Sequence, residues 1–226
     1  MLSAPRIPEL AQRDRFVRRA AKEGYVLTLA DEEFASVPSQ KTPDRTVQLF
    51  WSSAIEAKRW AEALTGDARL QDISLASFAA DILPGLKAAN GLAGTDWVAD
   101  PIEAEIDPLD VQLRLKLESL PHMLKRLAEK GELFLVSGEG QPFIEKLDRR
   151  GGAIDAIAVF ISRAEAERHL SRIRGTRVIA DLAADFQKST VPWAAERGLS
   201  IVIEQILGAG PVDIRAIDLR SRLLAA

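Results

Sequence analysis

The amino-acid sequence predicts an α+β fold built from two tandem copies of one small helix and mixed-sheet module packed against each other. Three observations predict it: an ordered internal repeat, short apolar runs of strand length between helical patterns, and a composition of 47% hydrophobic and 28% charged residues. Helices and strands do not alternate strictly, which favours α+β over a doubly wound sheet. We therefore expect a first module over residues 1–118 and a second over residues 119–226.

The internal repeat consists of five landmarks that recur in the same order, 107 to 109 residues apart. Any single pair could arise by chance, whereas the ordered set indicates duplication of one supersecondary unit. The paired segments are Phe16–Gly24 with Met123–Gly131, Ser53–Arg59 with Ser162–Arg168, Phe78 and Pro84 with Phe186 and Pro192, Gly91–Leu92 with Gly198–Leu199, and Asp110–Leu115 with Asp218–Leu223.

Each module is predicted to open with a helix that ends at a glycine, a residue that adopts the left-handed cap conformation. The predicted helices are 8–22, 53–64, 75–89 and from 108 onward, then 121–130, 162–173, 181–197 and from 215 onward. The predicted strands are 25–30, 34–38, 46–51 and 70–73, then 132–137, 142–147, 155–161 and 176–180, with one more after Gly91 and after Gly198. No Gly/Ser linker separates the modules, so Leu109–Lys130 is expected to run almost continuously as helix, with Ser119 as a candidate N-cap.

Composition excludes several classes of protein. The chain has no cysteine, which excludes disulfides, thiolate metal sites and cysteine nucleophiles. No apolar run approaches the ~20 residues that cross a bilayer, and residues 1–22 do not read as a secretory signal, so a cytoplasmic location is expected. The net charge of −3 argues against a dedicated nucleic-acid binder. The first module has 14 basic and 19 acidic residues and the second 16 and 14, a difference in sign that could steer a partner.

No recognised catalytic or cofactor motif occurs. A P-loop, a dinucleotide-binding glycine pattern, a zinc-protease helix and a nucleophile elbow are all absent from the sequence, so no cofactor or metal is predicted and an enzyme is less favoured than a binding protein. Ser53 and Ser162, each followed three residues later by Glu56 or Glu165, have the form of a capping box. We expect these serines to begin helices rather than to act as nucleophiles.

The candidate partner-binding residues are tryptophans and charged side chains. Tryptophan is enriched at interface hot spots, although core packing is the stronger expectation for most of the four. Arginines cluster between residues 163 and 177, and an acidic stretch runs from Asp96 to Asp110 without a basic residue. Solvated faces explain both runs, and a polar contact surface is the competing interpretation. The candidates selected are Trp51, Trp193, Arg163, Arg168, Arg172, Asp100, Glu103 and Glu105.

Arg168, His169 and Arg172 form the only crowded cluster that suits a small-molecule site or an enzyme of an undescribed kind. The cluster is present in one module only, because Trp60 stands at the repeat position of His169. Neither His169 nor the other histidine, His122, predicts a metal site, which usually needs three or four ligands. A His169 side chain on an open helix face, far from any pocket, would remove this alternative.

A series of short motifs runs through the first module: an aromatic-led strand, an acidic turn, a strand ending in Leu-Phe-Trp, a helix opening on serine, an aliphatic strand and a Leu-Pro-Gly-Leu segment. These are Gly24–Leu29, Asp31–Glu33, Leu49–Trp51, Ser52–Ser53, Ile73–Leu75 and Leu83–Leu86. In these features the first module resembles a bacterial family, the domain of unknown function 2750, over roughly residues 14–98. The resemblance implies a fold, but no established activity and no catalytic residues.

The second module keeps this layout with one replacement. Val191–Ala194 stands in place of Leu-Pro-Gly-Leu, and the segment Ala158–Ser162 leads into a helix. Through that segment the second module is similar to the SseB-like (enhanced serine sensitivity) domain.

The leading functional hypothesis is a non-enzymatic protein-binding or regulatory protein of unknown pathway, an adaptor or immunity-type protein. It depends on the repeated positions, which are caps, turns and core residues. We expect the partner to be another protein, bound on the surface shared by the modules, and neither nucleic acid nor a membrane. Two alternatives stay open: a small-molecule sensor or uncharacterised enzyme with a site in one module, and a structural dimerisation protein. A homodimer is compatible with the sequence.

Overall fold

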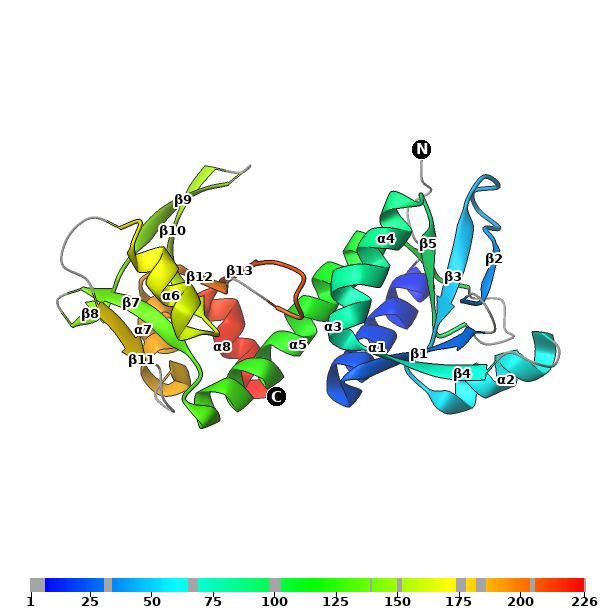
Figure 1. The fold of residues 1–226 in the computed structure, drawn as a ribbon, viewed down its shortest axis with the longest axis horizontal. Coiled ribbons are helices and arrows are strands. Elements are labelled where there is room, and N and C mark those ends of the chain that lie inside the picture. Colours follow the sequence, from blue (N-terminus) through cyan, green and yellow to red (C-terminus); the bar gives the residue numbers. More distant parts are fainter. Residues whose placement is uncertain are drawn as a thin grey trace. The chain divides into compact units, whose positions relative to one another are not determined.

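The computed structural model describes residues 7–30, 34–64, 69–97, 103–138, 140–149, 152–173, 178–181, 186–203 and 206–225. The chain divides into two compact units, Met1–Ser119 with Leu207–Ala209, and Leu120–Ile206 with Gly210–Ala226. Both units combine helices with mixed sheets, so the predicted α+β class is confirmed. Figure 1 follows the chain by colour from its N-terminus in blue to its C-terminus in red.

The helices of the first unit are α1 (Ile7–Glu23), α2 (Ala54–Leu64), α3 (Leu75–Ser77), the π-helical segment η1 (Phe78–Ile82), α4 (Leu83–Ala88) and the first part of α5 (Pro108–Lys130). α1 buries Phe16, Val17 and Ala20, whose spacing is that of one helix face. It ends where the amide of Gly24, at φ +84°, donates to the carbonyl of Ala20 at 2.9 Å. This left-handed cap confirms the predicted end of the first helix.

The strands of the first unit are β1 (Tyr25–Ala30), β2 (Ser36–Pro38), β3 (Thr46–Phe50), β4 (Arg69–Ser74), β5 (Leu92–Thr95) and β6 (Glu105–Ile106). β3 pairs in parallel with β5 and antiparallel with β2, and a bridge from Trp51 to Leu27 connects it to β1. β1 pairs antiparallel with β4, and β5 pairs antiparallel with β6. The parallel pair needs a long crossover, which α2, β4 and the helical run over residues 75–88 supply.

Two hydrophobic clusters fill the first unit. One gathers around Phe16, Phe50 and Phe78, and the ring of Phe78 meets those of Phe50 and Phe16 edge-to-face at centroid distances of 4.8 and 6.2 Å. Leu207 and Ala209 pack against this cluster and are counted with the first unit. The other cluster holds three of the four tryptophans.

The second unit contains the rest of α5, the helices α6 (Arg163–Leu170), α7 (Val191–Glu196) and α8 (Ala216–Ala225), and the π-helical segment η2 (Phe186–Thr190). Its strands are β7 (Phe134–Gly138), β8 (Gln141–Pro142), β9 (Glu145–Arg149), β10 (Gly152–Phe160), β11 (Val178–Asp181), β12 (Ser200–Ile203) and β13 (Val212–Arg215). β10 pairs in parallel with β12 on one side and antiparallel with β9 and β7 on the other. β7 also pairs antiparallel with β11, and β12 with β13.

The two units share an order of elements and a pattern of strand pairing. The central strand, β3 or β10, has one parallel neighbour and two antiparallel ones in each unit. In each unit a π-helical segment also precedes a helix whose first turn contains proline, Pro84 or Pro192. Proline lacks an N–H and its ring crowds the carbonyl four residues earlier, so a regular α-helical turn is disfavoured just before it.

Two details differ from the sequence prediction. α5 runs without interruption from Pro108 to Lys130 with Pro121 inside it, so Ser119 does not begin a new helix. The strands β6 and β13 were not predicted: β6 has only two residues, and β13 runs directly into α8. None of the helices in the described parts of the chain combines the length and apolar character needed to cross a bilayer.

Candidate functional site

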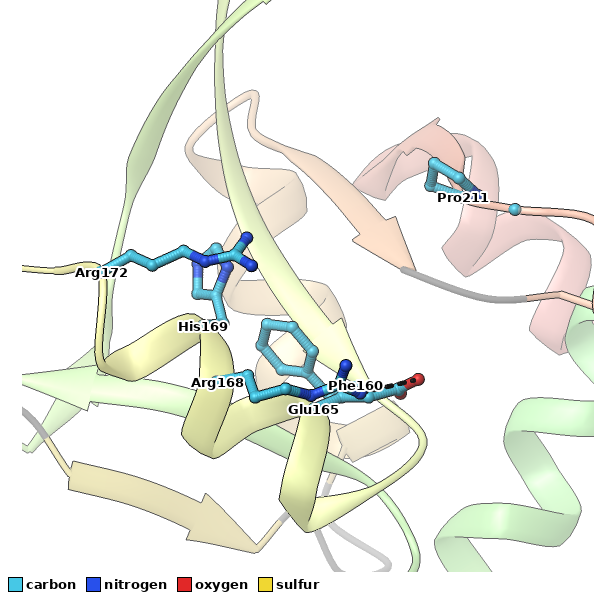
Figure 2. Close-up of a pocket in the computed structure, with 7 residues that line it drawn as sticks. Phe160, Glu165, Arg168, His169, Arg172 and Pro211 are labelled. Carbon is cyan, nitrogen blue, oxygen red and sulfur yellow. Dashed lines mark ion pairs between the residues drawn. The ribbon is translucent and has the colours of Figure 1, made fainter.

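A pocket of about 330 Å³ lies on the second unit, beside α6. Its lining residues are Phe160, Glu165, Arg168, His169, Arg172, Gly210 and Pro211. In Figure 2 the side chains of α6 and its C-terminal turn stand together, and Pro211 lies across from them. The volume is at the lower end of the range for sites that hold small molecules.

Three pocket residues lie on one face of α6, and a fourth, Arg172, follows in the turn after the helix ends at Leu170. Glu165, Arg168, His169 and Arg172 follow the i, i+3, i+4, i+7 pattern of a helix stripe. The helix begins at Ser162, whose hydroxyl accepts a hydrogen bond from the amide of Glu165 at 3.2 Å. The predicted N-cap at Ser162 is therefore confirmed. The reciprocal bond of a capping box is not formed, because Oε2 of Glu165 is buried without a hydrogen-bond partner among the described residues.

His169 is held by a carboxylate and an aromatic ring. Its Nε2 lies 2.6 Å from Oε1 of Glu145, and its ring centroid lies 5.0 Å from that of Phe160. Glu145 begins β9, opposite Ala156 of β10, so the register of this antiparallel pair brings the carboxylate to the imidazole. Sequence reasoning missed Glu145, because nothing in the local pattern indicates which strand residue faces the helix.

The other pocket groups are cationic and exposed. The guanidinium of Arg168 lies 4.0 Å from Glu165, a loose pair marked by the dashed line in Figure 2. Arg172 is exposed in the turn that follows α6. The structure thus brings Arg168, His169 and Arg172 together at a pocket. Guanidinium groups offer several parallel N–H donors to an oxyanion. Across the described residues, no three His, Cys, Asp or Glu side chains gather closely enough to hold a metal ion.

The corresponding position in the first unit belongs to the core. α2 and α6 each follow the central strand, and a serine precedes each of them, Ser53 or Ser162. Seven residues after that serine stands Trp60 in the first unit and His169 in the second. Trp60 is only 9% exposed, so the place that lines a pocket in the second unit is filled by an indole ring in the first.

Three tryptophans pack together at this place in the first unit. The ring centroids of Trp51 and Trp60 lie 5.9 Å apart, and those of Trp60 and Trp97 lie 6.4 Å apart. The indole N–H of Trp51 donates to the carbonyl of Trp97 at 2.8 Å, and that of Trp97 donates to the carbonyl of Ala104 at 2.9 Å. Because its polar atom is satisfied, the ring of Trp51 is fully buried. Trp51, predicted as a partner-binding residue, therefore presents no exposed ring surface in this structure.

A buried carboxylate lies next to the tryptophans, at Asp96. The residue follows β5 with φ +49°, a left-handed conformation that aspartate tolerates better than most residues. Its carboxylate accepts hydrogen bonds from the amide of Ser52 at 2.7 Å and from the hydroxyl of Ser52 at 2.8 Å. Burial raises the pKa of Asp96 to about 6, and the charge of Glu56 also raises it. The two hydrogen bonds from Ser52 and the charge of Arg15 act in the opposite direction and lower the pKa. Asp96 is fully enclosed, so it serves the first unit as a structural group.

The predicted acidic candidates are only partly at the surface. Glu105 is 7% exposed and accepts hydrogen bonds from the hydroxyl of Ser39 at 2.5 Å and the amide of Gln40 at 2.9 Å. The carboxylate predicted as a partner contact is thus buried and engaged by internal donors. Glu103 is half-buried and accepts from the side-chain amide of Gln40 at 2.6 Å, and burial together with Glu105 raises its pKa. Asp100 lies outside the described residues.

Two further candidates lie at the surface of the second unit but do not line the pocket. Trp193 on α7 is half-buried, and the guanidinium of Arg197 lies 4.5 Å from its ring centroid. Arg163 at the start of α6 is exposed, and its guanidinium lies 5.5 Å from the ring centroid of Phe134. Both pairs have cation–π geometry, which rigidifies long side chains at the surface.

The solved structures that match this chain include two Tic22 proteins. One is Tic22 from Anabaena, described as a protein-transport protein, with 14% identity, a TM-score of 0.25, and coverage of 85% of this chain and 87% of that one. The other is Tic22 from Plasmodium falciparum, with 10% identity, a TM-score of 0.24, and coverage of 76% and 85%. Similarity at this level supports no conclusion about function. No curated protein matches the sequence.

A family model described as "Protein of unknown function (DUF2750)" matches residues 13–115. The match runs from α1 into α5 and spans all six strands of the first unit. It also covers the whole range, 14–98, over which the sequence resemblance was predicted. The second copy and the SseB-like character of residues 119–226 stay predictions. The first unit therefore matches the DUF2750 family of unknown function over residues 13–115, a little less than half of the chain.

Proposed function

We propose that the protein is a non-enzymatic ligand-binding protein of regulatory type, whose second unit binds a small anion in the pocket beside α6. One observation carries the proposal: Arg168 and His169 of α6, and Arg172 of the turn that follows it, line one open pocket of about 330 Å³. Convergent cationic donors in a concave site suit carboxylate and phosphate groups. The sensor alternative raised by the sequence is thus the one that the geometry favours.

We also propose that the two units are divergent copies with different roles. The shared order of elements and the matching strand pairs support duplication. In the first unit Trp60 completes a tryptophan core, whereas His169 at the same position in the second unit lines a pocket. Truncating a buried tryptophan typically lowers the free energy of unfolding by about 3–5 kcal/mol. A pocket in place of a packed tryptophan therefore loses stability, and a binding function would explain why the pocket is kept.

The pocket lining favours binding over catalysis. The seven lining residues supply two guanidinium groups, one imidazole, one carboxylate and apolar surface, and none of them is a serine, cysteine, threonine or lysine nucleophile. The imidazole is already engaged with Glu145 at 2.6 Å. Consumption of a bound ligand during a binding experiment would contradict this part of the proposal.

The test is calorimetric titration of the full-length protein with three probe anions: butyrate, inorganic phosphate and sulfate. We expect one-site binding of at least one probe. Arg168→Gln and Arg172→Gln are each expected to weaken it about tenfold or more, because each removes charge-assisted hydrogen bonds.

Two further variants sharpen this test. Arg220→Gln removes the same charge from an exposed position on α8 outside the pocket and is expected to leave affinity unchanged. His169→Trp introduces the residue type found at the first-unit position and is expected to fill the pocket and abolish binding, with the fold checked by circular dichroism. Equal weakening by Arg220→Gln, or binding that no pocket variant changes, would refute the proposed site.

A protein partner is the second candidate function, and Trp193 is the residue that favours it. Its ring is half-buried under the guanidinium of Arg197, and tryptophan and arginine dominate interface hot spots. Loss of a captured protein on Trp193→Ala in low-salt pull-downs would support this candidate, and equal capture by the variant would remove it. A homodimer and a cytoplasmic location likewise stay predictions.

A further inference from the structure

The charges around the pocket nearly cancel before any ligand enters. Arg168 and Arg172 contribute two positive charges and Glu165 contributes one negative charge. Glu145 adds a second negative charge 2.6 Å from the imidazole of His169. With a neutral imidazole the group has no net charge, and with an imidazolium it has a net charge of +1.

The contact with Glu145 determines which imidazole nitrogen carries a proton. A carboxylate only accepts hydrogen bonds, so Nε2 of His169 must be the donor in this pair. Within the described part of the chain, Nδ1 of His169 has no hydrogen-bond partner. In the neutral ring Nδ1 carries a lone pair that repels an anion. Only the protonated ring presents an Nδ1–H donor to one.

Few other charged groups surround the imidazole. β7 contains no ionisable residue. Asp155 and Lys146 form the cross-strand pair next to Ala156 and Glu145, so strand alternation directs them to the opposite face of the sheet from Glu145. The side chain of Asp181, at the end of β11, lies outside the described set. Among the described residues, the charges that face the imidazole are those of Glu145, Glu165, Arg168 and Arg172.

We infer that the pocket binds a small monocarboxylate together with one proton, which His169 takes up as the anion enters. This inference rests on the proposed function and names its ligand class. A single negative charge neutralises the net charge of the protonated pocket, whereas a phosphate dianion would leave an excess of −1. Phe160 and Pro211 add apolar surface to the lining, which suits a short hydrocarbon chain. Because only the protonated ring of His169 offers a donor at Nδ1, binding of the anion becomes sensitive to pH.

The experiment is calorimetry of the full-length protein with butyrate from pH 5.5 to 8.0, in buffers with different ionisation enthalpies. We expect net uptake of protons when butyrate binds, and an affinity for butyrate that falls as the pH rises, as proton linkage requires. Inorganic phosphate, a dianion at pH 8, is expected to bind more weakly than butyrate.

Variants separate the titrating group from its positioning residue. His169→Gln retains an amide donor for Glu145 but does not titrate, so butyrate binding is expected to become independent of pH and to take up no proton. Glu145→Gln removes the negative charge that the proton offsets. The number of protons taken up per butyrate bound at pH 8 is therefore expected to be smaller than in the wild type. Arg220→Gln, outside the pocket, is expected to preserve the wild-type pH dependence.

The outcomes distinguish this inference from the proposed function. Butyrate binding of constant affinity without proton uptake would overturn the inference and leave the anion site in place. Tighter binding of phosphate than of butyrate at pH 8 would overturn the ligand class. Failure of every probe anion to bind at any pH in the range would overturn the proposed function, and the inference with it.

Discussion

Replacing Asp96 by asparagine tests the electrostatics of the first unit directly. Asp96 has no exposed surface, and both oxygens of its carboxylate lie within hydrogen-bond distance of Ser52. Asp96→Asn keeps an oxygen that accepts from the amide of Ser52. Asparagine also tolerates φ +49° as readily as aspartate does. The substitution therefore removes the ionisable group and changes little else.

The expected magnitude follows from the pKa. Burial raises the pKa of Asp96 from 3.8 to about 6 in the folded protein. The folded state therefore binds this proton more tightly than the unfolded state. The contribution of Asp96 to stability is highest below about pH 4, falls as the pH rises toward 6, and is constant above that. At 1.36 kcal/mol per pKa unit, ionised Asp96 costs about 3 kcal/mol at pH 7. Asp96→Asn is expected to raise the free energy of unfolding at pH 7 by up to this amount and to leave it unchanged at pH 4.

The assay is urea unfolding followed by tryptophan fluorescence between pH 4 and 7.5, because three tryptophans lie in the core beside Asp96. Asp72→Asn is the control, since it removes an exposed carboxylate from β4 and is expected to change stability by less than about 0.5 kcal/mol. If the difference in free energy of unfolding between wild type and Asp96→Asn does not grow with pH, the reasoning is refuted. A destabilised Asp96→Asn variant at pH 7 would also refute it.

Two further predictions concern folding. Ser162→Ala removes the N-cap of α6 and is expected to lower the free energy of unfolding by about 1 kcal/mol. Ser53→Ala is the matched comparison. It is expected to lower the free energy of unfolding by less, because no bond from the amide of Glu56 to the Ser53 hydroxyl occurs among the described residues. Equal losses in urea unfolding would contradict the assigned cap. Gly94→Ala is expected to destabilise the first unit by about 1–3 kcal/mol, because a Cβ there would lie 2.7 Å from Leu49 and 2.9 Å from Val47. A variant as stable as wild type would contradict this and show that the core rearranges to accept the added methyl group.

Much of the fold and part of the site were predictable from local signals. The predicted helices 8–22 and 53–64 and the strand 25–30 agree with α1, α2 and β1 to within one residue. Apolar periodicity and terminal glycines report local conformation, and both are visible in one sequence. The clustering of Arg168, His169 and Arg172 was predictable for the same reason, because residues three or four positions apart lie close together in a helix and in the turn that ends it.

Only the tertiary structure decided which side chains are buried and which of them meet across the sheet. Trp51 and Glu105 carry no local mark that distinguishes a surface residue from a core one, and both are enclosed because distant backbone and side-chain groups satisfy their polar atoms. Glu145 reaches His169 through the register of β9 on β10, and a shift of one residue would turn the carboxylate to the opposite face of the sheet. Such a register depends on long-range pairing, which helical periodicity does not contain.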